Sequence, residues 1–503
     1  MMAAPKVRGI AAIVAGGLLP LAFAPFGLFP VAFISLALLF WLWLESTPRQ
    51  ALLLGLLFGI GQFGVGVSWV YVAIHTFGHT VVPLAIFLTS LFVLTLALFP
   101  ALAGYAVARI RALLPNSSSA FQLILVMPLL WGLLEWVRGW ILTGFPWLNL
   151  GYSQIDSPLR GWAPIVGVYG LNWIVALVAG IALWWWLQRK QTGWLNIPAI
   201  VAIALPLGVG QLLAQVEWTS AKGESLSVAL VQGNVAQSTK WQIGGLQRRI
   251  ERYSEMTRPL IGKHQLIVWP ENAITQFYHR LDEEFFNPMA ESAKAQGSEI
   301  VLGVPVLRDD DRYYTSMAVA GDAGRQYHKH HLVPFGEYLP LDSLLRGLID
   351  FFNMPMSDYV SGAAGQSPLK VAGTTAAVTI CYEDLFGEEY LSQLPEAEIL
   401  LNGSNNAWYG DSLAAHQHLE IARMRSLELG RWTLRATTNG ITAIINPQGL
   451  ITKRSPQFEQ AVVTGVIQPM QGVTPYIVWG NWLVILLMVA GLGVVVKQAR
   501  WKA

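Results

Sequence analysis

Residues 376–384 read Ala-Ala-Val-Thr-Ile-Cys-Tyr-Glu-Asp, an apolar run that ends abruptly in a thiol followed by two carboxylates. The run itself, Ala376–Ile380, has the length and the apolar character of a buried strand. Similar runs recur through the second half of the chain: Ser227–Val231, Gln265–Trp269, Glu299–Val304, Ser316–Ala320, Ile399–Asn402, Leu434–Thr438 and Thr442–Ile445. Amphipathic helical stretches lie between several of these runs, at 243–259, 281–296 and 413–429. Because strands and helices alternate, the sequence predicts a layered α/β or α+β domain around Cys381.

The first part of the chain has a different composition. Residues 1–214 contain only twelve Asp, Glu, Lys or Arg residues, whereas residues 215–471 contain forty-nine. The whole chain is 53% hydrophobic and 13% charged, well below the charged fraction of about a quarter that is usual in soluble domains. We therefore expect a multi-span α-helical membrane bundle in residues 1–214, an extramembrane α/β domain in residues 215–471, and a C-terminal transmembrane helix with a short tail in residues 472–503.

Eight segments have the roughly 20 apolar residues that a helix needs to cross a bilayer. They are residues 9–26, 28–44, 51–74, 81–106, 121–137, 165–187, 195–214 and 476–496. The first segment resembles a signal peptide, because Lys6 and Arg8 precede an apolar run that ends in Ala22-Phe23-Ala24. Pro25 at the would-be cleavage point and the six spans that follow favour a retained helix instead.

Lys and Arg residues in short loops indicate the orientation of the spans, since these residues favour the cytoplasmic side. Arg138 and Arg160 fall on one side, and ten residues fall on the other: Lys6, Arg8, Arg49, Arg109, Arg111, Arg189, Lys190, Lys497, Arg500 and Lys502. Both termini are then cytoplasmic, and residues 215–471 lie on the opposite face, which in a bacterium is the periplasmic side of the inner membrane. ATP is out of reach there and no Walker or dinucleotide motif occurs, so we expect a reaction without a cofactor. The net charge of +2 argues against a nucleic-acid partner.

Three segments of the soluble part carry residues suited to covalent chemistry. One strand stops at Pro270 and presents Glu271, a loop carries Lys329 and Glu337 eight residues apart, and Cys381 ends a further strand. Strand ends and the loops after them are where α/β sheets hold active groups. A thiol that attacks an ester or an amide needs a base for its proton and a cation for the developing negative charge, roles that Glu and Lys supply. Taken singly, each residue also has an ordinary explanation. Glu271 fits an acid near a helix start, Lys329 fits a surface cation, and Cys381 fits a small buried thiol. Cys381 is the only cysteine of the chain.

Taken as an ordered set, these motifs resemble the nitrilase superfamily. The set is Trp269-Pro270-Glu271, then Lys329 with Pro334-Phe335-Gly336-Glu337 beyond it, then Ile380-Cys381-Tyr382-Glu383-Asp384. With eight spans around that domain, the chain resembles the membrane-embedded branch, the apolipoprotein N-acyltransferases. The resemblance extends over essentially the whole chain and includes Val231-Gln232-Gly233-Asn234, Trp241 and Gly403-Ser404-Asn405-Asn406-Ala407-Trp408.

The resemblance implies an αββα sandwich with a catalytic triad. In it Glu271 is the general base and acid, Lys329 the partner of the oxyanion, and Cys381 the nucleophile. Glu337 matches a second, supporting glutamate. Tyr382, Glu383 and Trp241 match further positions that matter in this family.

The resemblance also implies the two substrates. The acyl donor is a phospholipid, phosphatidylethanolamine, and the acceptor is the N-terminal amine of a diacylated apolipoprotein. Two other interpretations stay open from the residues alone. A membrane-tethered amidase or nitrile hydrolase would use the same triad with water in place of the amine, and a membrane scaffold would use the domain only to bind partners.

Four residues are candidates for substrate binding: Trp147, Trp241, Arg346 and Trp408. Trp147 lies in the aromatic loop 144–152, which is either an interfacial belt or the wall of a lipid-access site. Arg346 lies in segment 344–356, which is either a buried helix or an amphipathic arm at the membrane interface, where Arg346 would meet a lipid phosphate. Two histidine groups, His328, His330 and His331 and then His416 and His418, lack acidic or Cys partners at zinc-like spacing, so we expect polar loop and helix residues and no metal site.

Overall fold

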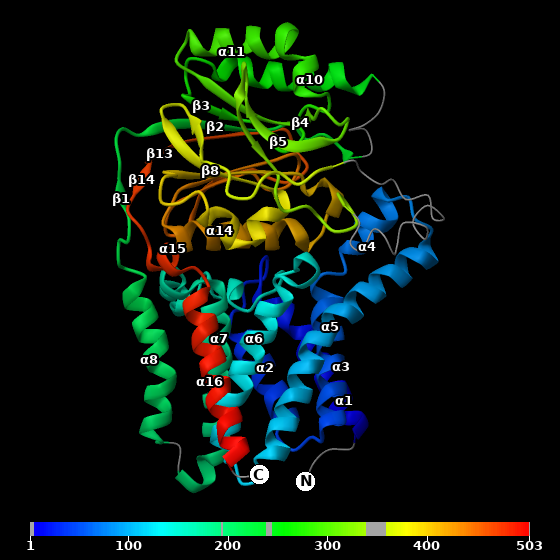
Figure 1. Ribbon diagram of the computed structural model, residues 1–503, viewed down its shortest axis with the longest axis vertical. Helices are drawn as coiled ribbons and strands as arrows, with labels where there is room; N and C mark the ends of the chain where they lie inside the picture. The colour runs from blue at the N-terminus through cyan, green and yellow to red at the C-terminus, as the bar shows by residue number, and fades with distance from the viewer. Residues whose placement is uncertain (1–4, 193–194, 238–243, 339–358, 502–503) are drawn as a thin grey trace. The chain divides into compact units, whose positions relative to one another are not determined.

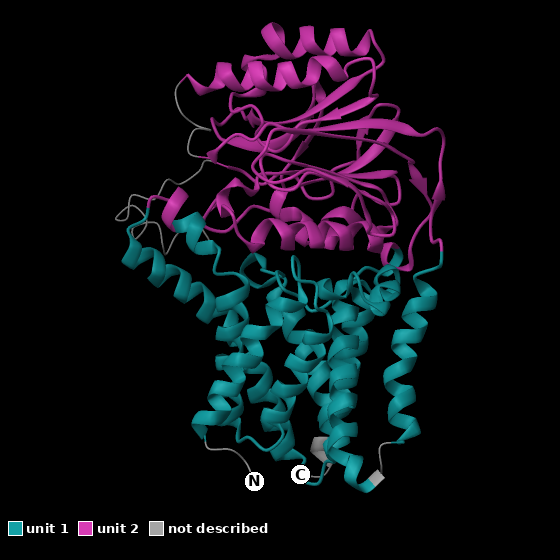
Figure 2. Cartoon of the chain, turned by 180° about the vertical axis from the view of Figure 1, so that it is seen from behind, with its two compact units in different colours: residues 1–74, 80–216, 478–503 teal, residues 75–79, 217–477 magenta. Residues whose placement is uncertain are grey.

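The computed structural model describes residues 5–192, 195–237, 244–338 and 359–501 of the 503-residue chain. The chain forms two compact units, which Figure 2 shows in different colours. Unit 1 comprises residues 1–74, 80–216 and 478–503, and unit 2 comprises residues 75–79 and 217–477. Segment 344–356, which includes Arg346, lies outside the described residues, as does Trp241.

Unit 1 is helical, and each of the eight predicted apolar segments corresponds to a helix. The main helices are α1 (Pro5–Leu18), α2 (Pro30–Trp43), α3 (Pro48–Gly66), α5 (Val82–Leu113), α6 (Met127–Arg138), α7 (Ala163–Thr192), α8 (Ile197–Leu213) and α16 (Trp482–Trp501). Among the described residues, five helical stretches are long and apolar enough to cross a membrane: Pro5–Ala22, Pro48–Gly66, Val82–Leu113, Phe121–Arg138 and Pro158–Gln191. The other three segments contain apolar helical stretches of 10–17 residues, Pro30–Trp43, Ile197–Leu213 and Trp482–Gln498, shorter than the roughly 20 residues that span a typical bilayer core.

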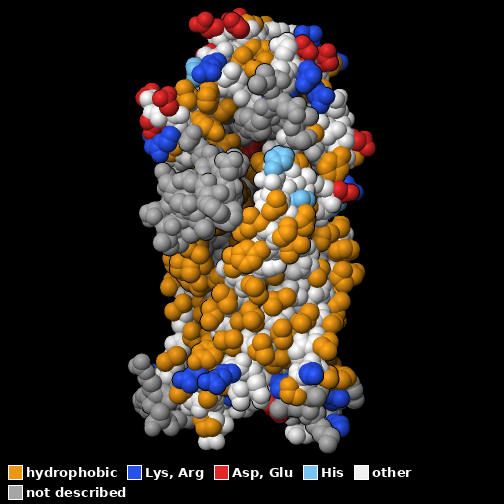
Figure 3. Space-filling model, turned by 90° about the vertical axis from the view of Figure 1, so that its right-hand side faces the viewer, with side chains coloured by type: hydrophobic (Ala, Val, Ile, Leu, Met, Phe, Trp, Pro, Cys, Tyr) orange, Lys and Arg blue, Asp and Glu red, His pale blue; other side chains and the backbone are white. Residues whose placement is uncertain are grey.

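The surface of unit 1 has the character of a protein in lipid. Figure 3 shows hydrophobic side chains over its helices, and Lys and Arg side chains gathered at the end where α1 begins and α16 ends. Large apolar side chains such as Ile86, Phe87 and Trp186 are more than half exposed. Exposed apolar surface of this extent is unfavourable in water and favourable in a bilayer.

Helix α3 approaches its neighbours at distances that only glycine permits. A Cβ atom at Gly61 would lie 2.2 Å from the Ile13 carbonyl oxygen of α1, and one at Gly55 would lie 2.3 Å from the Pro100 carbonyl oxygen of α5. In lipid, helices associate mainly through close van der Waals packing, and small residues at the crossing make that packing possible. The glycines of α3 therefore fix how α1, α3 and α5 assemble.

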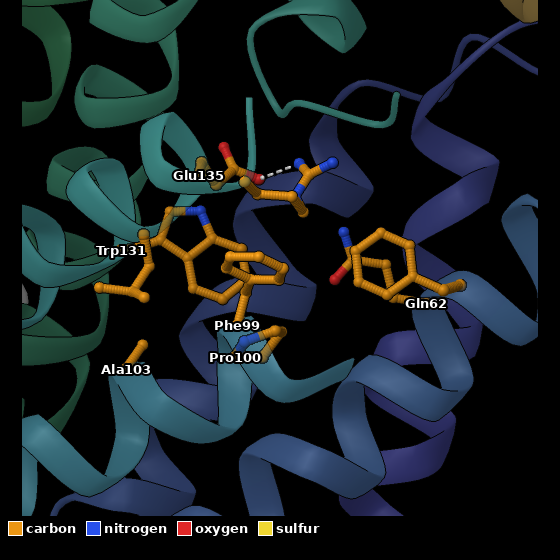
Figure 4. Close-up of a pocket in the computed structure, with 9 residues that line it drawn as sticks. Gln62, Phe99, Pro100, Ala103, Trp131 and Glu135 are labelled. Atoms are coloured by element: carbon orange, nitrogen blue, oxygen red, sulfur yellow. Dashed lines mark hydrogen bonds and ion pairs between the residues drawn. The ribbon is translucent and has the colours of Figure 1, made fainter. Parts of the chain in front are cut away.

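The aromatic loop 144–152 is held inside unit 1 by a buried arginine at the end of α6. Arg138 donates to the carbonyl oxygen of Trp147 at 2.7 Å and pairs with Glu135 at 3.5 Å. Figure 4 shows Glu135 in this pair beside a small pocket, into which the side chain of Gln62 points. The Trp147 ring is buried and lies 4.8 Å from the ring of Trp69. Trp147 is therefore a packing residue of unit 1 and not part of an exposed interfacial belt, because the Arg138 hydrogen bonds fold the loop inward.

Unit 2 contains two six-stranded sheets. The first has the strand order β13-β2-β3-β4-β5-β6 and the second the order β12-β11-β10-β9-β8-β7. The first sheet consists of β2 (Leu226–Gln232), β3 (Leu266–Val268), β4 (Glu299–Leu307), β5 (Tyr313–Val319), β6 (Asp322–His328) and β13 (Ala461–Ile467). The second consists of β7 (Leu369–Val371), β8 (Thr374–Ile380), β9 (Ile399–Ser404), β10 (Thr433–Thr437), β11 (Ala443–Ile445) and β12 (Ile451–Arg454). A short pair, β1 (Ser220–Ala221) with β14 (Met470–Gln471), lies outside both sheets.

All eight strands predicted from the sequence exist, and each is an inner strand of a sheet. Besides the short pair β1 and β14, four strands were not predicted, and these, β6, β7, β12 and β13, are the edge strands of the two sheets. Two of these edge strands, β6 and β12, are polar because one side of an edge strand faces solvent, whereas β7 is only three residues long and β13 is interrupted by Thr464 and Gly465. Strand β12 reads Ile-Thr-Lys-Arg and β6 reads Asp-Ala-Gly-Arg-Gln-Tyr-His, so neither shows the apolar run of a buried strand.

The two sheets pack face to face, and helices cover both outer faces. Side chains of β2, β3, β8 and β9, such as Val228, Val268, Val378 and Leu401, form the core between the sheets. Helices α10 (Gly245–Thr257) and α11 (Asn287–Lys294) cover the first sheet, and α13 (Gly387–Leu391) and α14 (Leu413–Leu429) cover the second (Figure 1). This arrangement confirms the predicted αββα sandwich.

The parallel strands of both sheets position the site. Strands β2, β3 and β4 are parallel to one another, as are β8, β9 and β10. Parallel strands bring their carboxyl ends to one edge of a sheet, and the segments that follow β3 and β8 carry Glu271 and Cys381. The turn after β3 runs directly against β4, because a Cβ atom at Gly303 would lie 2.2 Å from the Pro270 carbonyl oxygen and 2.6 Å from the Cα atom of Glu271.

Gly303→Ala should therefore displace this turn and lower the free energy of unfolding by about 1–3 kcal/mol, the usual cost of overpacking a rigid site. Thermal unfolding of the purified protein, followed by circular dichroism, measures the loss. Gly324→Ala in β6 is the matched control, since the nearest atom to its added Cβ is the Oδ1 of exposed Asp322, at 3.3 Å. Equal losses in the two variants would contradict the steric explanation.

Candidate active site

Cys381 directly follows strand β8 and starts a sharp turn. Its φ angle is +53°, in the left-handed region that residues other than glycine seldom adopt. Only 7% of the residue is exposed. Such a conformation costs on the order of 1–3 kcal/mol and persists only where the surroundings enforce it. The turn therefore holds the thiol in one defined place at the end of the strand.

Lys329 follows β6 and is completely buried. Its Nζ atom lies 2.7 Å from Oε1 of Glu337 and 3.6 Å from Oε1 of Glu271. Burial by itself lowers the pKa of this ammonium group, but Glu337, Glu271 and Cys381 together raise it well above its ordinary value. Lys329 is therefore a permanent buried cation between two carboxylates.

Glu337 holds the lysine in place. Its Oε1 accepts the hydrogen bond from Lys329, and its Oε2 accepts one from the backbone N–H of Val333 at 2.8 Å. Burial raises the pKa of this carboxyl, against the opposing effect of Lys329. The supporting glutamate expected from the sequence thus lies in direct contact with the lysine.

The thiol of Cys381 carries its proton at neutral pH. Burial and the charge of Glu271 raise its pKa to about 12, while Lys329 and a hydrogen bond from the Asn405 backbone act in the opposite direction. Since a protonated thiol is a poor nucleophile, its proton has to leave during the attack itself. Glu271 is buried and its charge acts on the thiol, so it stays the predicted base.

Glu383 joins the two loops that carry Lys329 and Cys381. Its Oε1 accepts hydrogen bonds from the backbone N–H groups of His330 and His331 at 2.6 and 2.9 Å, and its Oε2 accepts one from Ile380 at 2.6 Å. Burial raises the pKa of this carboxyl to about 8. The carboxylate of Glu383 thus bonds to the backbone next to Lys329 and next to Cys381. It positions these two residues through their backbone and not through their side chains.

The remaining candidates from the sequence lie in different surroundings. Tyr382 is buried, and its ring packs against the ring of Phe386 at 5.3 Å. Trp408 lies in the short helix Asn406–Tyr409, is 39% exposed, and contacts the ring of Phe77 at 6.0 Å. Trp147 belongs to unit 1. A role for these tryptophans in substrate binding stays a prediction.

Several residues beneath Cys381 escaped the sequence analysis. His418 of α14, expected as an ordinary polar helix residue, is 1% exposed and lies 3.1 Å from the Cys381 carbonyl oxygen. Asn406 contacts His418 at 3.0 Å, and Arg435 of β10 contacts Asp384 at 3.2 Å. The adjacent Asn405-Asn406 at the end of a buried strand was the one available signal, since such a strand end seldom carries two amides without a structural use.

Known proteins share this organisation. Residues 15–181 match the family model of the apolipoprotein N-acyltransferase N-terminal domain, and residues 227–475 match that of carbon-nitrogen hydrolases. An apolipoprotein N-acyltransferase of Methylococcus capsulatus is 43% identical, over 98% of this chain and 96% of its own length. Those of Nitrosomonas europaea and Azotobacter vinelandii are 41% and 42% identical, over 96% and 97% of this chain and 97% and 95% of their own lengths. Set beside the αββα sandwich and the apolar helices, full-length identity at this level shows that the chain belongs to the apolipoprotein N-acyltransferase family.

Proposed function

We propose that this protein transfers an acyl chain from a membrane phospholipid to the N-terminal amine of a diacylated apolipoprotein. The observation that carries the proposal is the buried group of Glu271, Lys329 and Cys381, in which a neutral thiol, a cation and a carboxylate act on one another. These are the three parts that acyl transfer through a thiol requires. Phosphatidylethanolamine is the proposed donor, and the proposal includes no cofactor.

The first half-reaction forms a thioester. Glu271 takes the proton of Cys381 as the sulfur attacks the ester carbonyl carbon of the phospholipid, and a C–S bond forms. The ammonium group of Lys329 stabilises the negative oxygen of the tetrahedral intermediate. When the C–O bond breaks, the proton on Glu271 passes to the leaving oxygen, and a lysophospholipid departs.

The second half-reaction moves the acyl group to nitrogen. The amine of the diacylglyceryl cysteine attacks the thioester carbon, and Glu271 accepts a proton from that nitrogen. The C–S bond breaks, the thiol regains its proton from Glu271, and an amide leaves. Conversion of the phospholipid ester to an amide drives the two half-reactions, so the reaction proceeds without ATP.

We further propose that the protein lies in the bacterial inner membrane with unit 2 on the periplasmic side. Ten Lys and Arg residues on the side of the termini against two on the other support this orientation. A compartment without ATP suits a reaction that exchanges an ester for an amide.

The first test is the covalent intermediate. Incubation of the purified protein with phosphatidylethanolamine alone should add one acyl mass, which hydroxylamine removes. Because Cys381 is the only cysteine, the intact mass locates the thioester without further mapping. Cys381→Ser should form no such adduct. Release of lysophospholipid only when both substrates are present would contradict a two-step mechanism.

A second test separates the catalytic role of Lys329 from its role in stability. Lys329→Met should slow formation of the acyl adduct about 10²–10³-fold, the loss typical of removing one oxyanion donor. It should also destabilise the protein, because two buried carboxylates lose their cation. The double variant Lys329→Met/Glu337→Gln removes one of these charges, so it should regain stability while staying inactive. Recovery of activity in the double variant would show that Lys329 is only structural.

A third test concerns orientation. A reporter inserted at the exposed turn near Gly321 in unit 2 should be active if it requires the periplasm, and one fused after residue 503 should be active if it requires the cytoplasm. The reverse pattern would exclude the proposed access of unit 2 to exported lipoproteins.

A further inference from the structure

His418 occupies a position beneath the nucleophile that the proposed mechanism does not use. It lies on α14, which covers the outer face of the second sheet. Its Nε2 atom is 3.1 Å from the carbonyl oxygen of Cys381, and its Nδ1 atom is 3.0 Å from Nδ2 of Asn406. A buried imidazole with a polar partner at each nitrogen is held in a single orientation.

The partners of His418 also decide which nitrogen carries the proton. Arg435 can only donate hydrogen bonds, and its Nη2 contacts Oδ1 of Asn406 at 3.3 Å. The amide nitrogen of Asn406 therefore faces His418, and it too can only donate. Nδ1 of His418 must then be the acceptor, which leaves the proton on Nε2 and makes this nitrogen the donor to the Cys381 carbonyl oxygen.

The positive charge of Arg435, at the far end of this chain of hydrogen bonds, is compensated by polar partners. Nη1 of Arg435 lies 3.2 Å from Oδ2 of Asp384 and 2.6 Å from Oδ1 of Asn402. Asp384 in turn accepts a hydrogen bond from the Tyr390 hydroxyl at 2.8 Å. Burial and the nearby cation of Arg435 lower the pKa of His418 well below its ordinary value, so the imidazole stays neutral. The network therefore keeps one direction of donation, from Arg435 through Asn406 and His418 to Cys381.

Cys381 needs such a partner for a conformational reason. The parallel ladder between β8 and β9 ends with Ile380, and Cys381 begins the short 3-10 helix Cys381–Leu385, so the hydrogen bond from His418 acts at the junction of the two elements. The positive φ angle of Cys381 is unfavourable for a residue with a side chain. A hydrogen bond to this carbonyl group favours the strained conformation over a relaxed one.

We propose that His418 is a positioning residue, whose Nε2–H bond to the Cys381 carbonyl oxygen holds the nucleophile in its reactive conformation. The inference rests on the proposed role of Cys381 as nucleophile and adds to it. Because His418 holds the backbone of Cys381, it acts on the rate of acylation and not on substrate affinity.

Two variants of similar polarity separate this role from simple packing. In His418→Gln, the Nε2 atom stands as many bonds from Cα as the Nε2 of histidine, so it can donate to the Cys381 carbonyl oxygen. In His418→Asn, the Oδ1 atom takes the place of Nδ1 and accepts from Asn406, but no donor reaches Cys381. His418→Phe keeps an aromatic ring and removes both hydrogen bonds.

The probe is p-nitrophenyl acetate, an activated ester that is independent of lipid recognition. Released p-nitrophenolate gives the rate of acetylation of the full-length protein, and the intact mass confirms one acetyl group. The Asn and Phe variants should react about tenfold more slowly than the wild type, the loss expected when one well-placed hydrogen bond is removed. The Gln variant should stay within about threefold of the wild type. With phosphatidylethanolamine and an acceptor lipopeptide, kcat should fall in the same order while KM stays constant.

The outcomes distinguish this inference from the proposed function. A wild-type thiol that accepts no acyl group from either ester would refute the role of Cys381 and the inference with it. A reactive wild type with Asn and Gln variants of equal rate, or with Asn the faster, would refute the inference alone, because His418 would then only support Asn406. Melting temperatures of the Gln and Asn variants within a few degrees of each other would confirm that the rates are compared between folded proteins.

Discussion

The buried ammonium group of Lys329 is the constraint on which the site of unit 2 depends. A charge completely removed from water is costly unless opposite charges and hydrogen bonds compensate it. Glu271 and Glu337 provide that compensation from two different segments, the end of β3 and the loop after β6. The three side chains are therefore stable only together, and the order of the strands in the first sheet is what brings them together. The same charges then determine what the neighbouring thiol can do.

These charges leave the Cys381 thiol neutral in the resting state, beside the ion pair of Lys329 and Glu271. The carboxylate of Glu271 raises the pKa of Cys381 more than Lys329 lowers it, so a standing thiolate is disfavoured. In the proposed mechanism, the thiol becomes nucleophilic only when a substrate carbonyl is present and its proton moves to Glu271 during the attack. A protonated thiol is also less reactive towards oxidants than a thiolate, which suits an enzyme proposed to lie on the periplasmic side.

Beneath this catalytic layer lies a second layer that is polar and almost entirely satisfied. Glu383 fixes the backbone on both sides of the site, and Arg435, Asn406 and His418 connect Asp384 with the carbonyl group of Cys381. Buried polar networks of this kind are costly when one member is missing and rigid when all are present. Their rigidity is useful here, because the nucleophile has a backbone conformation that it would not adopt alone.

The sequence by itself determined the division into an apolar helical part and an α/β part, the eight inner strands and the three residues of the expected triad. It could do so because local periodicity reports burial, and because the ordered motifs around Glu271, Lys329 and Cys381 resemble those of a known superfamily, which is where the expected triad comes from. Only the tertiary structure decided the rest. The edge strands β6 and β12 lack an apolar pattern because they face solvent on one side. The burial of Trp147 depends on hydrogen bonds from Arg138, and the place of His418 depends on a helix that packs beneath a strand 37 residues earlier in the chain. Each of these features is a pairing between separate segments, and pairings of buried polar groups are settled by packing in three dimensions, which leaves no periodic signal in the sequence.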